Sequence, residues 1–258
     1  MNFIKYQLRD SVAKITLNRS DVLNSFNKAM ALELQSVFDN CMNDNSVRAL
    51  YLTGEGRAFC AGQDLAEAIA KDGPELKNIV KDHYNPIIKK IRAIEKPVVC
   101  GVNGVAAGAG ANIALACDIV VAGKSASFIQ AFSKIGLIPD SGGTFFLPRL
   151  VGLQRATALM MLGDKVNAES ALQMGMIYKV FEDDRLQEEA FNMAKTLASM
   201  PTRGLGLTKK LLNQSMFNNL EKQLDMEEEI QTMAGKTHDY NEGVKAFLEK
   251  RKPVFKGE

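Results

Sequence analysis

Short apolar runs with the character of buried strands alternate with helical patterns through the first part of the chain. The strand-like runs span Val47 to Thr53, Val98 to Val102 and Ile119 to Ala122, and apolar residues recur at helical spacing from Lys28 to Asp44 and from Pro74 to about Ile94. Strands and helices that alternate in this way are typical of an α/β fold with right-handed crossover connections. This alternation constrains the fold more than any other feature, and it predicts an α/β core.

The pattern differs at both ends of this core. Near the start, Ile4 to Leu8 and Ala13 to Leu17 alternate apolar and polar residues around a polar turn at Asp10, which predicts a β-hairpin. After Arg149 the apolar spacing is almost entirely helical. We therefore expect a helical C-terminal region, built from the segments 155–162, 168–174, 185–200, 202–216, 220–233 and 241–250.

The charge balance argues against polyanionic partners. The chain of 258 residues carries 32 Lys and Arg against 30 Asp and Glu, a formal net charge of +2. Such a balance gives no electrostatic footprint for nucleic acid or a membrane surface. In addition, no apolar run approaches the roughly 20 residues of a membrane-spanning helix. We expect neither a nucleic-acid partner nor a membrane partner.

Cysteines and histidines form no metal-binding pattern in the sequence. His83 and His238 have no second His or Cys at ligand spacing, and the cysteines include no CxxC pair. We therefore predict that the chain holds no metal. Widely spaced thiols favour a reducing compartment, and the opening segment lacks the order of a signal peptide, so we expect a cytoplasmic protein. The cysteines are Cys41, Cys60, Cys100 and Cys117.

Two glycine-rich segments expose backbone amides at loops. The first runs from Gly56 to Leu65 after a strand, and the second runs from Asn103 to Gly110 into a helix. The first amides of a helix have no partner within it, and two amides that point at one spot can stabilise the charge that develops on a carbonyl oxygen. Spacing alone leaves tight packing turns as an equal alternative. A phosphate-binding loop is disfavoured because the GxGxxG pattern is absent.

Asp140 is a carboxylate in an apolar stretch. Leu137, Ile138 and Pro139 precede it, and Ser141 opens what resembles the start of a helix. Apolar neighbours raise the pKa of a carboxyl group by desolvation, which suits a group that transfers protons. The alternative from the residues alone is that Asp140 is the N-cap of the following helix.

Several motifs in one order resemble the enoyl-CoA hydratase/isomerase family, also called the crotonase superfamily. The resemblance extends from near residue 3 to the tail at Lys252, which is essentially the whole chain. A set of ordered motifs is far more specific than a single glycine loop. The motifs are Asn18-Arg19 with Asn24, Gly56 to Leu65, Lys96 to Asp118, Ile138 to Thr144 and Phe247 to Lys252.

The resemblance implies a fold and an assembly. The fold would be a crotonase-type spiral of ββα turns with a helical C-terminal region. We expect residues 1–200 to form the spiral core with the acyl-CoA site and residues 201–258 to form a helical trimerisation region. The assembly implied is a homotrimer or a dimer of trimers.

The resemblance also implies site residues. The backbone N–H groups of Gln63 and Ala109 would form the oxyanion hole around the thioester oxygen, and Asp140 would be the catalytic carboxylate. Coenzyme A, as part of the substrate and not as a cofactor, would lie along one loop and be completed by a neighbouring subunit's C-terminal helix. The residues expected to bind substrate or coenzyme A are Arg57, Ala61, Gly62, Asp64, Gly108, Phe132, Phe247 and Lys250.

Two positions depart from the hydratases of this family. Those enzymes use two glutamates to position and activate water, and the matching residues here are Asn112 and Phe132. Neither side chain accepts or delivers a proton at neutral pH. Water addition by that mechanism is therefore disfavoured, and the working carboxylate would be Asp140, as in the isomerases and aryl-CoA dehalogenases of the family.

We therefore predict an acyl-CoA isomerase that needs no cofactor. Within the family, the chain is most similar to the isomerases that convert the ring epoxide of epoxyphenylacetyl-CoA to an oxepin in phenylacetate catabolism, and a shift of a 3-enoyl-CoA double bond to the 2-position is also implied. The alternatives are an enoyl-CoA hydratase, a dehalogenase, which the absence of any Trp disfavours, and a non-catalytic CoA-binding paralogue. This similarity rests on Val105 to Ala111, Ala131 to Asp140, Gly204 to Leu207 and Asp239 to Val244.

Overall fold

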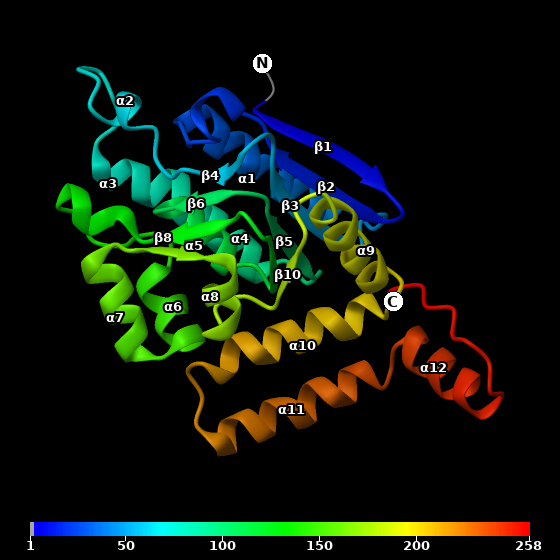
Figure 1. Cartoon of the computed structure of the whole chain (residues 1–258). Coiled ribbons are helices and arrows are strands. Elements are labelled where there is room, and N and C mark those ends of the chain that lie inside the picture. Colours follow the sequence, from blue (N-terminus) through cyan, green and yellow to red (C-terminus); the bar gives the residue numbers. More distant parts are fainter. Residues whose placement is uncertain (1–2) are drawn as a thin grey trace.

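The computed structural model describes residues 3–258, and Figure 1 shows two β-sheets surrounded by helices. The larger sheet has six strands, in the spatial order β1 (Ile4–Arg9), β2 (Val12–Leu17), β3 (Ala49–Gly54), β5 (Val98–Val102), β7 (Ile119–Gly123) and β10 (Lys179–Phe181). The smaller sheet has four, in the order β4 (Ala58–Cys60), β6 (Val105–Ala107), β8 (Ser127–Ile129) and β9 (Lys165–Asn167).

The predicted hairpin is confirmed, and the interior pairs are parallel. Strands β1 and β2 pair antiparallel through a two-residue turn at Asp10 and Ser11, which have φ of 52° and 58°, as hairpins of matching twist require. From β2 through β3, β5, β7 and β10 every pair is parallel. Strands β3 and β5 are buried along their whole length, which explains why they read as unbroken apolar runs.

Helices cover both faces of the larger sheet. On one face, α1 (Lys28–Asn43) and α4 (Asn85–Ala93) pack together, and alternate strand residues such as Leu50 and Leu52 belong to that core. On the other face, α9 (Leu186–Ala198) contacts the central strands, where Tyr51 and Phe191 meet edge to face. The α/β expectation is therefore confirmed, with the core divided between the two faces of one sheet.

The helix expected from Pro74 to Ile94 is not continuous, which corrects that prediction. It consists of α3 (Leu76–Asn78), a π-helix η2 (Ile79–Tyr84) and α4. Pro86 stands at the start of α4, and a proline ring clashes with the carbonyl four residues earlier. Just before this proline the helical hydrogen bonds span five residues, as in a π-helix: Asn85 donates its backbone N–H to the carbonyl of Val80.

The C-terminal region is helical, as predicted. Figure 1 shows α11 and α12 on the side of α10 that faces away from the sheets. Lys209 on α10 is buried and donates to the carbonyl of Ile91 at 2.7 Å and to the Asp118 carboxylate at 2.7 Å, which fixes α10 to the core. The three helices are α10 (Thr202–Ser215), α11 (Leu220–Ala234) and α12 (His238–Leu248).

Two features are absent from the described residues. Within residues 3–258, no helix combines the length and the apolarity that a membrane crossing requires. The same residues include no group of three or more His, Cys, Asp or Glu side chains placed to hold a metal ion. The remaining helices are η1 (Ser20–Val22), α2 (Leu65–Ala68), α5 (Ala109–Leu115), η3 (Ala131–Ile135), α6 (Gly143–Val151), α7 (Leu153–Leu162) and α8 (Ala168–Gln173).

Candidate active site

The backbone around Gln63 leaves one amide directed away from the protein's own acceptors. Phe26 donates its N–H to the carbonyl of Gly62 at 2.7 Å and accepts the N–H of Asp64 at 2.8 Å, so the two segments form a single parallel bridge. The N–H of Gln63 lies between these two bonds and donates to no acceptor within residues 3–258. Gln63 itself is half-buried. A free amide at a partly buried loop is available to an incoming carbonyl oxygen.

The second free amide lies at the start of α5. Gly108 precedes this helix with φ 52° and ψ −125°, a conformation that only glycine adopts, and its own N–H donates to the carbonyl of Ile129 at 2.9 Å. Ala109 is the first helical residue and is buried. Its N–H has no acceptor among the described residues, as expected for the first turn of a helix.

The two loops that carry these amides meet at Gly62. A Cβ atom at Gly62 would lie 3.0 Å from the carbonyl oxygen of Ala107 and 3.6 Å from the backbone nitrogen of Ala109. Gly62 also has φ of 97°. The tight packing turns are therefore present, because the glycine permits a close approach of the two loops that carry Gln63 and Ala109. The oxyanion hole stays a prediction.

Asp140 does not cap the helix that follows it, so that alternative is wrong. The N-cap position of helix α6 is Gly142, which has no side chain with which to cap the helix. The carboxylate of Asp140 instead accepts a hydrogen bond from the hydroxyl of Ser141 at 2.9 Å. Burial raises the pKa of Asp140 above its usual value, and the bond from Ser141 partly opposes that increase.

The apolar surroundings of Asp140 differ from the prediction. Leu137 and Ile138 are 38% and 81% exposed, because the chain leaves the short helix η3 and turns outward before Asp140. Phe132 is buried, and its ring lies 3.7 Å from the place of a Cβ atom at Gly108. Leu137 and Ile138, which precede Asp140 in the sequence, are therefore not buried around its carboxylate.

Tyr84 is a site residue that the sequence analysis missed. Its hydroxyl donates to the side-chain carbonyl oxygen of Gln63 at 2.7 Å, and its ring packs edge to face against Phe26. The pKa of Tyr84 lies well above its ordinary value because of burial, with further contributions from nearby negative groups that include Asp140 and Glu67. Tyr84 thus connects the π-helix η2 with the side chain of Gln63. The signal in the sequence was Pro86, which stands at the start of α4 just after the π-helix that carries this tyrosine.

Asn112 lies beneath the site and is fully buried. Its side-chain amide donates to the backbone carbonyl of Asp140 at 2.9 Å and accepts from the side chain of Gln130 at 2.8 Å. It therefore has no direct opening to solvent. Asn112 thus connects α5 with the Asp140 loop through its side chain.

The residues expected along the coenzyme A loop have mixed surroundings. Arg57 is exposed, and Ala61 is half-buried with its N–H donated to the carbonyl of Leu23 at 2.9 Å. The Asp64 carboxylate accepts from the N–H of Ala66 at 3.1 Å, which caps α2, and pairs with Arg19 at 3.0 Å. In this chain Asp64 therefore stabilises the loop, and Arg57 is the cation of this loop that is exposed.

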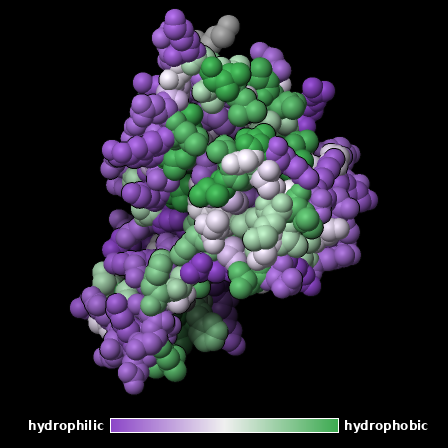
Figure 2. All heavy atoms as spheres, turned by 90° about the vertical axis from the view of Figure 1, so that its left-hand side faces the viewer, coloured by the Kyte–Doolittle hydropathy of each residue, from purple (hydrophilic) through white to green (hydrophobic). Residues whose placement is uncertain are grey.

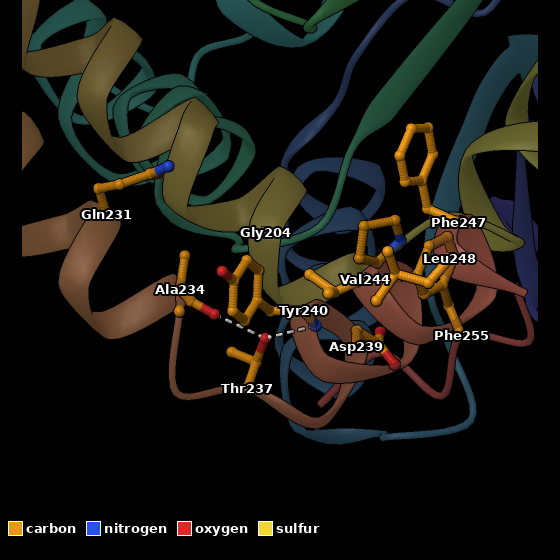
Figure 3. A pocket seen from close by; sticks show the side chains of 13 residues that line it. Gly204, Gln231, Ala234, Thr237, Asp239, Tyr240, Val244, Phe247, Leu248 and Phe255 are labelled. Carbon is orange, nitrogen blue, oxygen red and sulfur yellow. Dashed lines mark hydrogen bonds between the residues drawn. The ribbon is translucent and has the colours of Figure 1, made fainter.

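Phe247 and Lys250 lie at the C-terminal helix and are not brought to Asp140 within this chain. Phe247 is 82% exposed and lines a cavity of about 580 Å³ between α10, α11 and α12. Figure 3 shows Phe247, Leu248 and Val244 from α12 at one end of this cavity, with Gln231 of α11 at the other. The prediction gave both residues a role on a neighbouring subunit, which a single chain does not test.

Apolar side chains are also exposed on the face that carries α2, α3 and α7. Figure 2 looks onto this side and shows several hydrophobic areas among polar ones. Large exposed apolar areas are typical of binding surfaces. The exposed residues of η3, α7 and the Asp140 loop are Ile135, Leu137, Ile138, Leu153, Met161 and Leu162.

Comparisons with known proteins agree on the family and include both isomerases and hydratases. The sequence profile described as "Enoyl-CoA hydratase/isomerase" matches residues 7–258. The chain is 47% identical to the 1,2-epoxyphenylacetyl-CoA isomerase of Escherichia coli K12 over 100% of this chain and 99% of that protein. It is 37% identical to the trans-2-decenoyl-[acyl-carrier-protein] isomerase of Streptococcus mutans, over 98% of each. The crystal structure of an enoyl-CoA hydratase from Bacillus anthracis superposes with a TM-score of 0.92 at 33% identity, covering 99% of this chain and 100% of that one.

Proposed function

This chain belongs to the enoyl-CoA hydratase/isomerase family, and we propose that within it the protein is an acyl-CoA isomerase with Asp140 as its acid/base residue. The proposal is carried by one partly buried carboxylate with a raised pKa, Asp140, together with two backbone N–H groups, of Gln63 and Ala109, that have no acceptor among the described residues. Asn112 and Phe132 support it, because neither can replace the glutamates on which water addition depends.

The proposed reaction moves one proton along the acyl chain. The carboxylate of Asp140 removes a proton from the α-carbon of a 3-enoyl-CoA, and the electron pair of that C–H bond delocalises onto the thioester oxygen as a dienolate. The N–H groups of Gln63 and Ala109 donate to that oxygen. Protonated Asp140 then delivers the proton to the γ-carbon, and the double bond comes to rest at the 2-position. No atom is gained or lost, so a single carboxylate is sufficient.

The oxyanion hole would supply most of the rate. Removing one such donor typically costs about 2.7–4 kcal/mol of transition-state stabilisation, so two donors make a modest base adequate. The raised pKa of Asp140 suits both halves of the reaction, since a stronger base removes the α-proton more readily and its conjugate acid still returns it.

We propose a ring epoxide of the phenylacetyl-CoA type as one substrate and a linear 3-enoyl thioester as the other. The first is the substrate for which the Escherichia coli relative is named. The second is supported by the Streptococcus mutans relative, which is named as an isomerase of trans-2-decenoyl-[acyl-carrier-protein], because isomerisation of an enoyl thioester is reversible. Conversion of the ring epoxide to an oxepin is also an isomerisation, so the same free amides and carboxylate would serve it. No cofactor is required for either reaction.

Coenzyme A binding and assembly belong to the same proposal. Arg57 is the exposed cation proposed to meet the coenzyme A phosphates, and Phe247 and Lys250 would complete the site from a neighbouring subunit. A trimer or a dimer of trimers would follow, with residues 201–258 as its main contact region. The cytoplasmic location stays a prediction.

The decisive test is a comparison of three substrates. The wild-type protein is incubated separately with a 3-enoyl-CoA, a 2-enoyl-CoA and epoxyphenylacetyl-CoA, and the products are followed by absorbance and mass. Conversion of the first or third without gain of 18 Da supports an isomerase. Rapid hydration of the 2-enoyl-CoA would instead identify a hydratase, and a lack of action on all three would favour a non-catalytic CoA-binding paralogue. Release of halide from a haloaryl-CoA would identify a dehalogenase.

A further inference from the structure

We infer that Asn112 is a positioning residue whose side-chain amide fixes Asp140 relative to the free amide of Ala109. The inference rests on the proposed function, because it concerns how the proposed base is held. Asn112 lies one helical turn after Ala109 in α5, so a rigid helix sets the distance between them. The bond from its amide to the carbonyl of Asp140, at 2.9 Å, extends that fixed geometry to the loop that bears the carboxylate.

The turn after Asp140 is built closely around this amide. The carbonyl of Asp140 also accepts the N–H of Gly143 at 2.8 Å. A Cβ atom at Gly143 would lie 2.4 Å from the amide nitrogen of Asn112, so only glycine permits the approach. The backbone of Asp140 is therefore held by two donors, and one of them comes from the helix that begins with Ala109.

Gln130 fixes which way the amide of Asn112 points. Its side-chain nitrogen donates to the oxygen of Asn112 at 2.8 Å, which leaves the nitrogen of Asn112 to face the Asp140 carbonyl. Reversal of that amide would place two carbonyl oxygens against each other. Gln130 is buried, and its own side-chain oxygen has no partner among the described residues. A buried acceptor without a partner is costly, which indicates that the donor half of this side chain is the useful one.

Gln130 also lies next to the glycine-rich loop that leads into α5. Gln130 directly follows Ile129, whose carbonyl accepts the N–H of Gly108 at 2.9 Å, and Gly108 directly precedes Ala109. The chain of contacts thus starts at Ala109, passes through Asn112 and Gln130, and returns to the same loop. Loss of Asn112 would remove this connection, so the loop that bears Asp140 could shift although the carboxylate itself is retained.

A loosened base lowers turnover more than binding. A misplacement of about 1 Å can cost about 100-fold in rate. We expect Asn112→Ala to lower kcat for a 3-enoyl-CoA about 10- to 100-fold with KM within about twofold. Gln130→Met, which keeps the length of the side chain and removes its amide, should lower kcat less, by about 3- to 10-fold, in the same direction.

The experiment combines these variants with Asp140→Asn and a control. Asn213→Ala is the control, because Asn213 on α10 likewise donates to a backbone carbonyl, that of Arg92 at 3.0 Å, and its side chain is hydrogen-bonded to Arg92 and to neither Asn112 nor Asp140. Purified variants are compared by thermal unfolding and by steady-state kinetics with the same substrate. If Asn112→Ala does not fold, Asn112→Ser and Gln130→Met carry the test.

The double variant separates positioning from general damage. If Asn112 acts through Asp140, adding Asn112→Ala to Asp140→Asn should leave the residual rate within about twofold, since effects of residues that act together are not additive. The inference is overturned if Asn112→Ala keeps the wild-type kcat, if it slows Asp140→Asn by the same factor as the wild type, or if Asn213→Ala slows turnover equally. Full activity of Asp140→Asn alone would overturn the proposed function instead.

Discussion

Replacing Gly108 by alanine should misdirect the N–H of Ala109, one of the two proposed oxyanion-hole donors, and leave Asp140 unchanged. Gly108 has φ 52° and ψ −125°, which an alanine does not adopt without strain of about 1–3 kcal/mol. A Cβ atom there would meet nothing closer than 3.7 Å, the ring of Phe132, so the cost is torsional and not a clash. The chain relieves that strain by rotating the peptide between residues 108 and 109, which turns the N–H of Ala109 away from the site.

The expected loss is that of one donor. Turnover of a 3-enoyl-CoA should fall about 10²- to 10³-fold, equivalent to about 2.7–4 kcal/mol. Stability should fall by about 1–3 kcal/mol, measured by denaturant unfolding. The assay follows the absorbance of the conjugated 2-enoyl thioester under saturating substrate, so that kcat and KM are separated.

Gly152 supplies the matched control. It lies between α6 and α7 with φ 81° and ψ 156°, again open only to glycine, and a Cβ atom there would have no neighbour within 4 Å. Gly152→Ala should therefore lose similar stability and keep its kcat. The reasoning is refuted if Gly108→Ala keeps the wild-type kcat while unfolding earlier, or if both variants lose activity equally.

Three further predictions concern other parts of the structure. Tyr84→Phe removes the donor to Gln63 and should lower kcat about tenfold, measured by steady-state kinetics, through movement of that loop; an unchanged kcat would exclude this role. Asp118→Ala leaves the buried Lys209 without its carboxylate partner and should lower the free energy of unfolding by about 3–5 kcal/mol with unchanged kcat. A loss below about 1 kcal/mol would contradict a stabilising role of this ion pair. Because Asp140 must be ionised to accept a proton and its pKa is raised, kcat/KM should fall as the pH is lowered through a midpoint above 3.8. Burial of the ionised carboxylate destabilises the folded state, so Asp140→Asn should unfold at a higher temperature than the wild type at pH 7 but not below pH 3.8, where the carboxyl group is protonated in both states.

Most of the core could be predicted because its signals are local and strong. The β5 prediction, Val98 to Val102, matches the structure at both ends, and the hairpin at Asp10 follows from period-two alternation. The five strands of three residues each, β4, β6, β8, β9 and β10, were missed, because three residues show no period and depend on their neighbours in the sheet. The π-helix before Pro86 was missed since its cause lies in the next helix.

The residues of the candidate site could be named from the sequence more readily than their contacts. The glycine pattern and the position of Asp140 pointed to Gln63, Ala109 and Asp140, whereas the hydrogen bond from Tyr84 to the side chain of Gln63 had no signal in the spacing. The exposure of Ile138 was not predictable, because an apolar residue in a loop carries no sign of the direction in which the chain turns. The contact between Asn112 and the Asp140 carbonyl joins residues 28 positions apart, and sequence spacing does not show it.

The rate of Asp140→Asn on a 3-enoyl-CoA tests the account most directly, since asparagine keeps the shape of the side chain and loses its basicity. The account predicts a fall in kcat of about 10²- to 10⁴-fold with a thermal unfolding midpoint at pH 7 no lower than that of the wild type. Turnover by a well-folded Asp140→Asn at the wild-type rate would show that another group carries the proton.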